Sequence, residues 1–317
     1  MFNITGDRMT IPMQPDEDGY TGRECPECKA YFKIVFGTGL KGTTHCICPH
    51  CGHKGDHNQF YTKDQIDYAT SLMQQYVQDE FHKMFKNLER KYPKHRAKRQ
   101  MIGFYVEAGP KPRVPIRYYS EQELETRVTC SNCTLQYAVY GVFAYCPDCG
   151  QHNSLQILGA SLDVTTKMLG LADTEEDKTI AEELIAGLLS NVVAKFDGFG
   201  REVCRVFVDK ASNPAQAADI RFQNLTGAQR NVQKHFGFDI AGLLTPDEWS
   251  TAIRGFQKRH LLAHNSGVID AEYIKKANDP SAVEGRKVTI STAEVTELIA
   301  IIRKLSAHII AEMGKLP

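Results

Sequence analysis

The spacing of the cysteines constrains this chain more than any other feature. Eight of its ten cysteines form four Cys-x-x-Cys pairs, which fall into two groups along the sequence. The pairs are Cys25/Cys28, Cys48/Cys51, Cys130/Cys133 and Cys146/Cys149. Two such pairs, brought together by a hairpin, supply the four soft ligands that zinc prefers in a tetrahedral site. The spacing therefore predicts two structural zinc ions, one in each group.

The first group leaves one choice of ligand open. Cys48 has neighbours that can also bind zinc, namely His45, Cys46, His50 and His53. Both groups end in Cys-Pro-x-Cys-Gly, which favours Cys48 and Cys51. A dithiol redox centre has one pair, so four pairs at this spacing argue against redox chemistry. With no apolar signal segment at the N-terminus, the pattern predicts a reducing compartment, the cytoplasm.

The two groups indicate an internal repeat, so we expect an α+β multi-domain protein. Zinc ribbons are predicted at residues 20–60 and 125–157, with a basic helical insert at 61–118 between them. Residues 31–36 are predicted to form a strand in the first ribbon. In the second, residues 135–139 and 142–145 are predicted to form a β-hairpin with Gly141 at its tip. Whether the ribbons bind nucleic acid or protein, or are only structural, stays open.

The balanced charge excludes few functions, and the apolar residues do not form the long run that a membrane-spanning helix requires. Lys and Arg number 38, as do Asp and Glu, and 42% of the residues are hydrophobic. That apolar share is sufficient for a folded core. The most apolar late stretch, residues 295–313, contains Arg303 and Lys304. It is therefore not expected to cross a bilayer, which requires about 20 apolar residues.

The insert carries a concentrated positive charge. Between residues 83 and 117 there are eleven Lys and Arg against two Glu, with aromatic residues between them. Phosphate backbones attract such clusters, and exposed aromatic rings can stack on unpaired bases. We therefore predict RNA contact at Lys94, Arg96, Lys98 and Arg99. The alternative is a solvated helix face whose opposite side is buried through Phe81, Met84, Phe85 and Leu88.

Residues 160–317 have helical periodicity and predict an all-α bundle. Leu184, Leu188, Val192 and Phe196 follow a helical spacing. Helix starts are predicted at Thr245-Pro246, with Glu248 three residues after the cap, and at Ser291 with Glu294. Asn213-Pro214 and residues 278–285 are expected to be loops, and Cys204 is expected in the core.

One short run in this segment suggests catalysis. Arg259-His260-Leu261-Leu262-Ala263-His264 is an R-x4-H motif, and Asn265-Ser266-Gly267-Val268-Ile269-Asp270 follows it. The motif and the His-Asn-x-Gly-hydrophobic-hydrophobic-Asp run resemble the HEPN superfamily, helical proteins that include metal-independent ribonucleases. The resemblance covers about residues 165–317, and it covers neither the cysteine groups nor the basic insert.

The resemblance implies an endoribonuclease that leaves a 2′,3′-cyclic phosphate. His264 would act as general acid and base, Arg259 would stabilise the charged phosphate, and His260 would orient or contact phosphate. Arg259 and His264 lie about 140° apart on an ideal helix, so one chain does not bring them onto one face. The family completes its site between two protomers, which implies a homodimer and a possible role in phage defence or as a toxin.

Other interpretations of these residues stay open. His260 and His264 are spaced i, i+4, as in a metal pair, although no carboxylate stands at a helpful position nearby. Basic residues at the end of a helix also interact favourably with the helix dipole, without any catalysis. The main alternative function is a non-catalytic zinc-ribbon adaptor for nucleic acid or protein, with an inert bundle that dimerises. A third is a bundle that binds nucleotides without cutting them.

Overall fold

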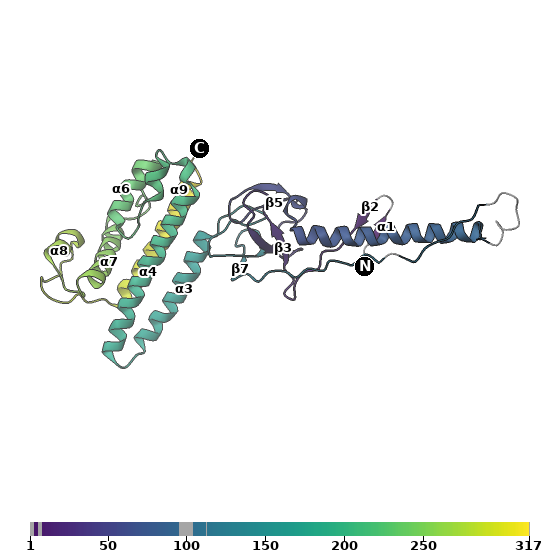
Figure 1. The fold of residues 1–317 in the computed structure, drawn as a ribbon. Helices are drawn as coiled ribbons and strands as arrows, with labels where there is room; N and C mark the ends of the chain where they lie inside the picture. The colour runs from purple at the N-terminus through teal and green to yellow at the C-terminus, as the bar shows by residue number, and fades with distance from the viewer. Residues whose placement is uncertain (1–2, 6–7, 95–103, 112, 317) are drawn as a thin grey trace. The chain divides into compact units, whose positions relative to one another are not determined.

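The computed structural model describes residues 3–5, 8–94, 104–111 and 113–316. The chain divides into two compact units, Met1–Gln151 and His152–Pro317. We call them the N-terminal unit and the C-terminal unit. About half of the residues are helical, and the strands form small antiparallel sheets (Figure 1). Within the described residues, no helix combines the length and the apolar character needed to traverse a bilayer.

A four-stranded antiparallel sheet forms the centre of the N-terminal unit. Its order is β3 (Thr21–Glu24), β4 (Tyr31–Ile34), β8 (Gln136–Val139) and β7 (Thr126–Thr129). The β3–β4 hairpin encloses the first Cys-x-x-Cys pair, and the β7–β8 hairpin encloses the third. The central strands β4 and β8 pair directly, with Phe32 opposite Val139. The two cysteine segments therefore share one sheet and one core.

Short elements complete this unit. Strands β5 (His45–Ile47) and β6 (Lys54–Asp56) pair with each other, as do β1 (Asn3–Thr5) and β2 (Arg8–Thr10). A 3-10 turn, η1 (His57–Phe60), follows β6 and places Phe60 in the core. Phe60 packs edge-on against Phe32 of the sheet, with ring centroids 6.0 Å apart.

The predicted hairpin of residues 135–145 is wrong. The predicted first arm does form β8, but β8 pairs with β7 on one side and with β4 on the other. Both backbone edges of β8 are thus used by strands that precede it in the sequence. The predicted strand at 31–36 is shorter in the structure, because β4 ends at Ile34.

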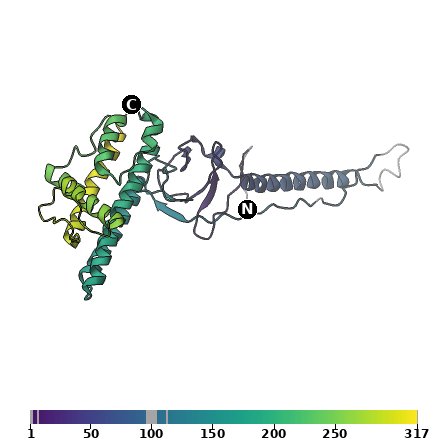
Figure 2. The same ribbon diagram turned by 60° about the vertical axis from the view of Figure 1, so that its left-hand side comes forward.

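A long helix, α1 (Lys63–Lys91), leaves the sheet and is followed by an extended segment that runs back beside it (Figures 1 and 2). Thr62 and Gln65 form a capping box at its start. The returning segment, residues 104–111 and 113–119, is attached through Arg117, whose backbone N–H donates to Ser71 Oγ at 3.1 Å. Among the described residues of the insert, 63–91 are therefore helical, whereas 104–111 and 113–118 are not.

The alternative of a buried stripe on this helix is wrong. Phe81 is 54% exposed, Met84 46% and Phe85 45%, while the buried side of α1 carries Gln65, Tyr68 and Ser71. The apolar row therefore faces away from the residues that α1 packs against.

The C-terminal unit is a helical bundle built around four long helices. These are α3 (Ser154–Asp173), α4 (Lys178–Val206), α7 (Pro246–His264) and α9 (Thr292–Met313). Phe196 of α4 lies in the core and makes edge-to-face contacts with Phe222 and Phe256. Cys204 is buried in the same core, as expected.

Shorter elements connect these helices: η2 (Val208–Lys210), α5 (Pro214–Ala218), α6 (Leu225–Phe236) and α8 (Ala271–Ala277). The predicted starts of α7 and α9 are confirmed, since both capping boxes form. Asn213-Pro214 is not a loop: the Asn213 side chain caps α5, whose first residue is Pro214. Helix α4 approaches Phe222 so closely that a Cβ on Gly200 would lie 2.4 Å from its ring.

Candidate functional site

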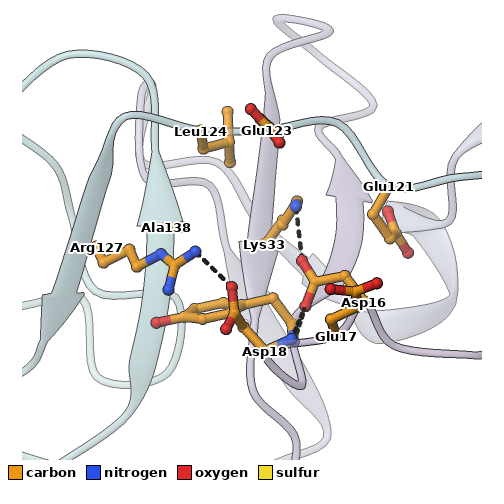
Figure 3. Close-up of a pocket in the computed structure, with 10 residues that line it drawn as sticks. Asp16, Glu17, Asp18, Lys33, Glu121, Glu123, Leu124, Arg127 and Ala138 are labelled. Atoms are coloured by element: carbon orange, nitrogen blue, oxygen red, sulfur yellow. Dashed lines mark hydrogen bonds and ion pairs between the residues drawn. The ribbon is translucent and has the colours of Figure 1, made fainter.

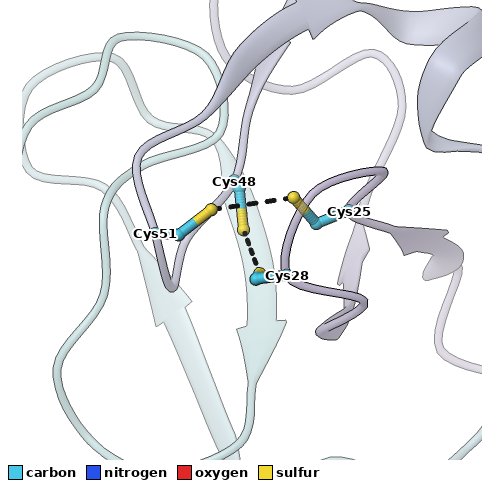
Figure 4. Close-up of side chains that lie close together, drawn as sticks. All are labelled: Cys25, Cys28, Cys48 and Cys51. Carbon is cyan, nitrogen blue, oxygen red and sulfur yellow. Dashed lines mark hydrogen bonds between the residues drawn. The ribbon is translucent and has the colours of Figure 1, made fainter.

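Each predicted group of four cysteines forms one compact cluster. In the first, Cys25 Sγ lies 3.7 Å from Cys51 Sγ, and Cys28 Sγ lies 3.6 Å from Cys48 Sγ (Figure 4). In the second, the matching distances are 3.7 Å for Cys130 and Cys149, and 3.4 Å for Cys133 and Cys146. Within each cluster the four sulfurs lie within 4.8 Å of one another.

This geometry fits a tetrahedral metal ion. A metal–sulfur bond of about 2.3 Å places the sulfurs at the corners of a tetrahedron with edges of about 3.8 Å. A disulfide would require about 2.05 Å, and all ten cysteines are free thiols in the structure. The backbone N–H of His50 also donates to Cys48 Sγ at 3.4 Å, which helps to stabilise a thiolate. Both clusters can therefore hold structural metal ions.

The structure also resolves the choice of ligand at the first site. Cys48, and not Cys46, joins the cluster with Cys25. Cys46 is fully buried on β5, where burial raises the pKa of its thiol to about 12. Burial likewise raises the pKa of Cys133 to about 11 and also raises that of Cys146. Binding of a metal to the second cluster must therefore displace protons.

The two sites are related by a repeated backbone pattern. In the first Cys-x-x-Cys pair of each site, the carbonyl oxygen of the first cysteine accepts a hydrogen bond from the backbone N–H of the residue that follows the second cysteine. Lys29 N–H donates to Cys25 O, and Thr134 N–H donates to Cys130 O, both at 3.0 Å. Lys29 and Thr134 both adopt positive φ, 60° and 65°. This left-handed residue turns the chain back after each Cys-x-x-Cys pair, so that the next strand can pair with the previous one.

The second turns of the two sites bind each other directly. Ile47 N–H donates to Pro147 O at 2.7 Å, and Tyr145 N–H donates to Pro49 O at 2.8 Å. Each donor immediately precedes a metal-cluster cysteine, and each acceptor is the proline of the other Cys-Pro-x-Cys turn. The bonds are reciprocal, so the repeat forms a pseudo-symmetric pair and each metal site supports its neighbour.

The R-x4-H residues lie at the C-terminal end of α7, but not all in one place. His260 and His264 are exposed, and their rings are close together, with centroids 4.7 Å apart. The half-buried Arg259 instead donates from Nη1 to Gln223 Oε1 at 3.4 Å. Its recorded partner among the described residues is therefore Gln223, on the chain just before α6.

Sequence reasoning missed the residues behind Arg259. The buried carboxylate of Asp197 accepts from the backbone N–H of Phe222 at 2.6 Å and of Gln223 at 3.2 Å. The Gln223 side chain also donates to Asp197 Oδ2 at 3.4 Å. Asp197, Gln223 and Arg259 thus form a chain of contacts from α4 to α7. An aspartate within an apolar helical pattern was the only signal in the sequence.

An ion pair between a buried lysine and a half-exposed glutamate supports the same end of α7. Lys258, next to Arg259, donates from Nζ to Glu294 at 2.6 Å and to the Thr289 carbonyl at 2.8 Å. Burial by itself would raise the pKa of Glu294, but its contact with Lys258 lowers it overall. This pair ties α7 to the start of α9.

The run after the motif has a structural role of its own. The Asn265 side chain donates to Val268 O at 2.7 Å, and Gly267 turns the chain with φ of 76°. Asp270 then caps α8 by accepting from Tyr273 N–H at 2.7 Å. These residues build the turn between α7 and α8, so their pattern is also accounted for by local folding.

The predicted nucleic-acid contacts are only partly described. Arg96, Lys98 and Arg99 lie outside the described residues. Lys94 is exposed, pairs with Glu107 at 3.4 Å, and lies 5.3 Å above the centre of the Tyr105 ring. A cation and a ring that are both accessible suit a phosphate and a base.

An acidic pocket of about 330 Å³ lies at the sheet (Figure 3). Its carboxylates include Asp16, which pairs with the buried Lys33 at 2.7 Å, and Asp18, which pairs with Arg127 at 2.6 Å. Burial raises the pKa of Asp16, yet Lys33 and backbone donors lower it overall. These contacts attach residues 16–18 to β4 and β7, which is a structural role.

No protein-family model matches this chain, no curated protein is detectably similar to it, and no solved structure matches it. The HEPN resemblance therefore depends on the residues of the motif alone.

Proposed function

We propose that this protein is a metal-independent endoribonuclease that acts as a homodimer. The observation that carries the proposal is the exposed pair of imidazoles, His260 and His264, beside a positioned Arg259 at one end of α7. Imidazole exchanges protons near neutral pH, and guanidinium presents fixed donors to phosphate. The HEPN resemblance assigns the same residue types to RNA cleavage.

The chemistry requires no metal at the reacting phosphate. The 2′-hydroxyl of the RNA attacks the adjacent phosphorus, while His264 accepts its proton and later returns one to the leaving 5′-oxygen. Arg259 stabilises the added negative charge on the phosphate oxygens. Gln223 and Asp197 orient the guanidinium, and His260 contacts phosphate. The products are a 2′,3′-cyclic phosphate and a 5′-hydroxyl.

A homodimer would bring an arginine and a histidine together, which one chain does not do. Arg259 and His264 of one chain lie on different sides of α7, as their spacing requires. A two-fold axis at the end of α7 would place the arginine of one protomer beside the histidine of the other. Activity would then depend on protein concentration.

The metal clusters have a structural part in this proposal. Four thiolates at tetrahedral spacing favour zinc, with two ions per chain. Lys94 and the neighbouring basic residues would hold RNA, and the ribbons would select RNA or a protein regulator. As in many such effectors, phage defence or toxin activity is the biological context that the resemblance suggests.

The test is cleavage of total RNA by the full chain in EDTA, in incubations short enough to keep the bound zinc. We expect the wild type to cut and Arg259→Ala and His264→Gln to lose at least about 100-fold of the rate, since general acid–base groups contribute about 10²–10⁴-fold. Arg230→Ala removes an exposed arginine of α6 and serves as the matched control. Equal rates in all four proteins would refute the assignment.

A second function, a non-catalytic zinc-ribbon adaptor, is favoured by one observation. The Asn265–Asp270 run is fully used in a turn between helices, so it needs no catalytic explanation. RNA binding without cleavage by a well-folded dimer would support the adaptor.

A further inference from the structure

A pocket of about 330 Å³ lies beside the glycine-rich loop that joins β4 to β5. Residues 37–43 of this loop line the pocket together with the side chains of Phe36, His57 and Asp148. We call this cavity the loop pocket. Its size suits a small ligand or one unit of a polymer, since ligand sites in proteins begin at about 300 Å³.

The second ribbon holds the loop in place. The buried carboxylate of Asp148 accepts from Leu40 N–H at 2.9 Å, and Thr38 Oγ1 accepts from Gln136 N–H at 3.1 Å. Gly39 has a φ of 81°, and a Cβ at this position would collide with the Asp148 carboxylate. Only glycine therefore fits there. These contacts join two segments about 100 residues apart, so the pocket is already formed without a ligand.

One wall of the loop pocket is an exposed aromatic ring with a cation next to it. Phe36 is 55% exposed, which is unusual for a phenylalanine of this size in a folded unit. Arg23 Cζ lies 4.8 Å from the centre of the Phe36 ring and 5.0 Å from that of Tyr61. The guanidinium thus fixes the ring and leaves more than half of it accessible. Accessible rings of this kind stack on unpaired nucleic-acid bases.

Two cations at the pocket have no anionic partner in the described part of the chain. Arg23 is 2% exposed, its Nη1 donates to the Gly22 carbonyl at 3.0 Å, and its Nε has no partner. Lys41 is exposed on the loop and forms no ion pair with any described residue. Asp148 is the one carboxylate among the lining residues, so a positive charge remains at the pocket. A negatively charged ligand would compensate it.

His57 adds a polar group beside the ring. Its imidazole lies 6.4 Å from the Phe36 ring, measured between centroids. Burial lowers the pKa of His57, and the neighbouring Arg23 lowers it further, so the imidazole is neutral at pH 7. A neutral imidazole offers one donor and one acceptor. The edge of a nucleobase presents the same mixture of groups.

We propose that the loop pocket binds one unpaired base of single-stranded RNA. The base stacks on Phe36, its polar edge faces His57, and the adjoining phosphate lies at Lys41. The choice of RNA rests on the proposed function, and the pocket adds a recognition site in the first ribbon. A nucleotide supplies both a flat face and a negative charge, whereas an apolar peptide side chain supplies no charge and a free anion does not use the ring.

The first test locates the RNA on the full chain. The His264→Gln variant is mixed with a short single-stranded RNA of mixed sequence, so that binding is observed without cleavage. Direct ultraviolet crosslinking followed by mass spectrometry should place a nucleotide on the peptide that contains Phe36 and the loop. Crosslinks that lie only in other segments would overturn the proposal.

The second test measures the contribution of the ring. Phe36→Ala should weaken RNA binding at least about 5-fold, the lower end of the effect of removing one stacking ring, and Phe36→Trp should keep the affinity. Tyr140→Ala removes a 40% exposed ring of the same unit outside the pocket and is the matched control. Circular dichroism and metal content would show that each variant is folded. Equal affinity of folded Phe36→Ala and the wild type would contradict base stacking.

The salt dependence tests the phosphate contact. Lys41→Ala should reduce the slope of log affinity against log salt concentration by about 0.7, the value for one phosphate of a single strand. An unchanged slope would remove Lys41 from the site.

The pocket and the ribonuclease fail in different ways. A crosslink in the loop without cleavage by the wild type would refute the ribonuclease and leave the base site. Cleavage by the wild type without a crosslink in the loop would refute the base site and leave the ribonuclease.

Discussion

The loss of one metal ion should weaken the other site. The sites share the β4–β8 pairing, and three backbone hydrogen bonds outside that pairing also join them: Val35 N–H to Gln136 O at 2.9 Å, and the two reciprocal bonds to Pro49 and Pro147. At about 1 kcal/mol net for each bond, these three contribute about 3 kcal/mol. A second site without its metal forfeits much of that support, so the first should bind its metal ion on the order of 100-fold more weakly.

Two variants, one for each site, test the coupling in both directions. Cys149→Ser removes a half-buried ligand of the second site, and Cys51→Ser removes an exposed ligand of the first. Each should retain one metal ion by elemental analysis. A chromophoric chelator should remove that ion at a chelator concentration about 100-fold lower than the wild type requires. Linkage requires the two couplings to be equal in size.

The control is Cys204→Ala, which removes a thiol from the core of the C-terminal unit, whereas both clusters belong to the N-terminal unit. It should keep two metal ions and the wild-type transfer curve. If the remaining ion in both ligand variants is released as in the wild type, the sites are independent and the shared sheet transmits nothing.

Three further predictions concern the C-terminal unit, and chemical denaturation checks each of them. Burial raises the pKa of Glu202, but hydrogen bonds from the His152 and Arg205 side chains outweigh it and lower the pKa to about 2 from 4.5. Glu202→Gln should therefore cost about 2 kcal/mol at neutral pH, and the difference from wild type should vanish as the pH falls from about 4.5 towards 2; a pH-independent difference would contradict this. Glu294→Gln should cost about 1–2 kcal/mol, because the buried Lys258 ammonium loses its anion while the exposure of Glu294 weakens their attraction, and adding Lys258→Met should recover part of that loss; strict additivity would argue against a coupled pair. Gly200→Ala should cost about 1–3 kcal/mol because its Cβ meets a buried ring at 2.4 Å, whereas Gly187→Ala, with open space, should be neutral or stabilising.

The local features of the fold could be read from the sequence. Cysteine pairs at fixed spacing define a metal cluster because the ligands of each half lie on one turn, and the clusters formed as predicted. The starts of α7 and α9 were equally predictable, because Thr245 and Ser291 satisfy backbone donors only three residues away. Such contacts depend on neighbours in the chain and change little with the rest of the molecule.

Contacts between distant segments were not predictable in this way. The alternation in residues 135–139 marks a strand but not its partners, and β8 joined β7 and β4 because the repeat pairs with itself. A buried apolar stripe on α1 was one of two interpretations that its sequence left open. Its exposure was decided by the returning segment, which occupies the opposite side.

The same distinction between local and long-range contacts applies to the candidate site. The sequence by itself determined which eight cysteines form the two clusters, and it placed Arg259, His260 and His264 on one helix, because these relations are local. Only the tertiary structure decided that Arg259 turns to Gln223 and Asp197, that the two histidines remain exposed, and that the two metal sites support each other. Those relations join residues tens of positions apart, and only the packing of the core brings such residues together.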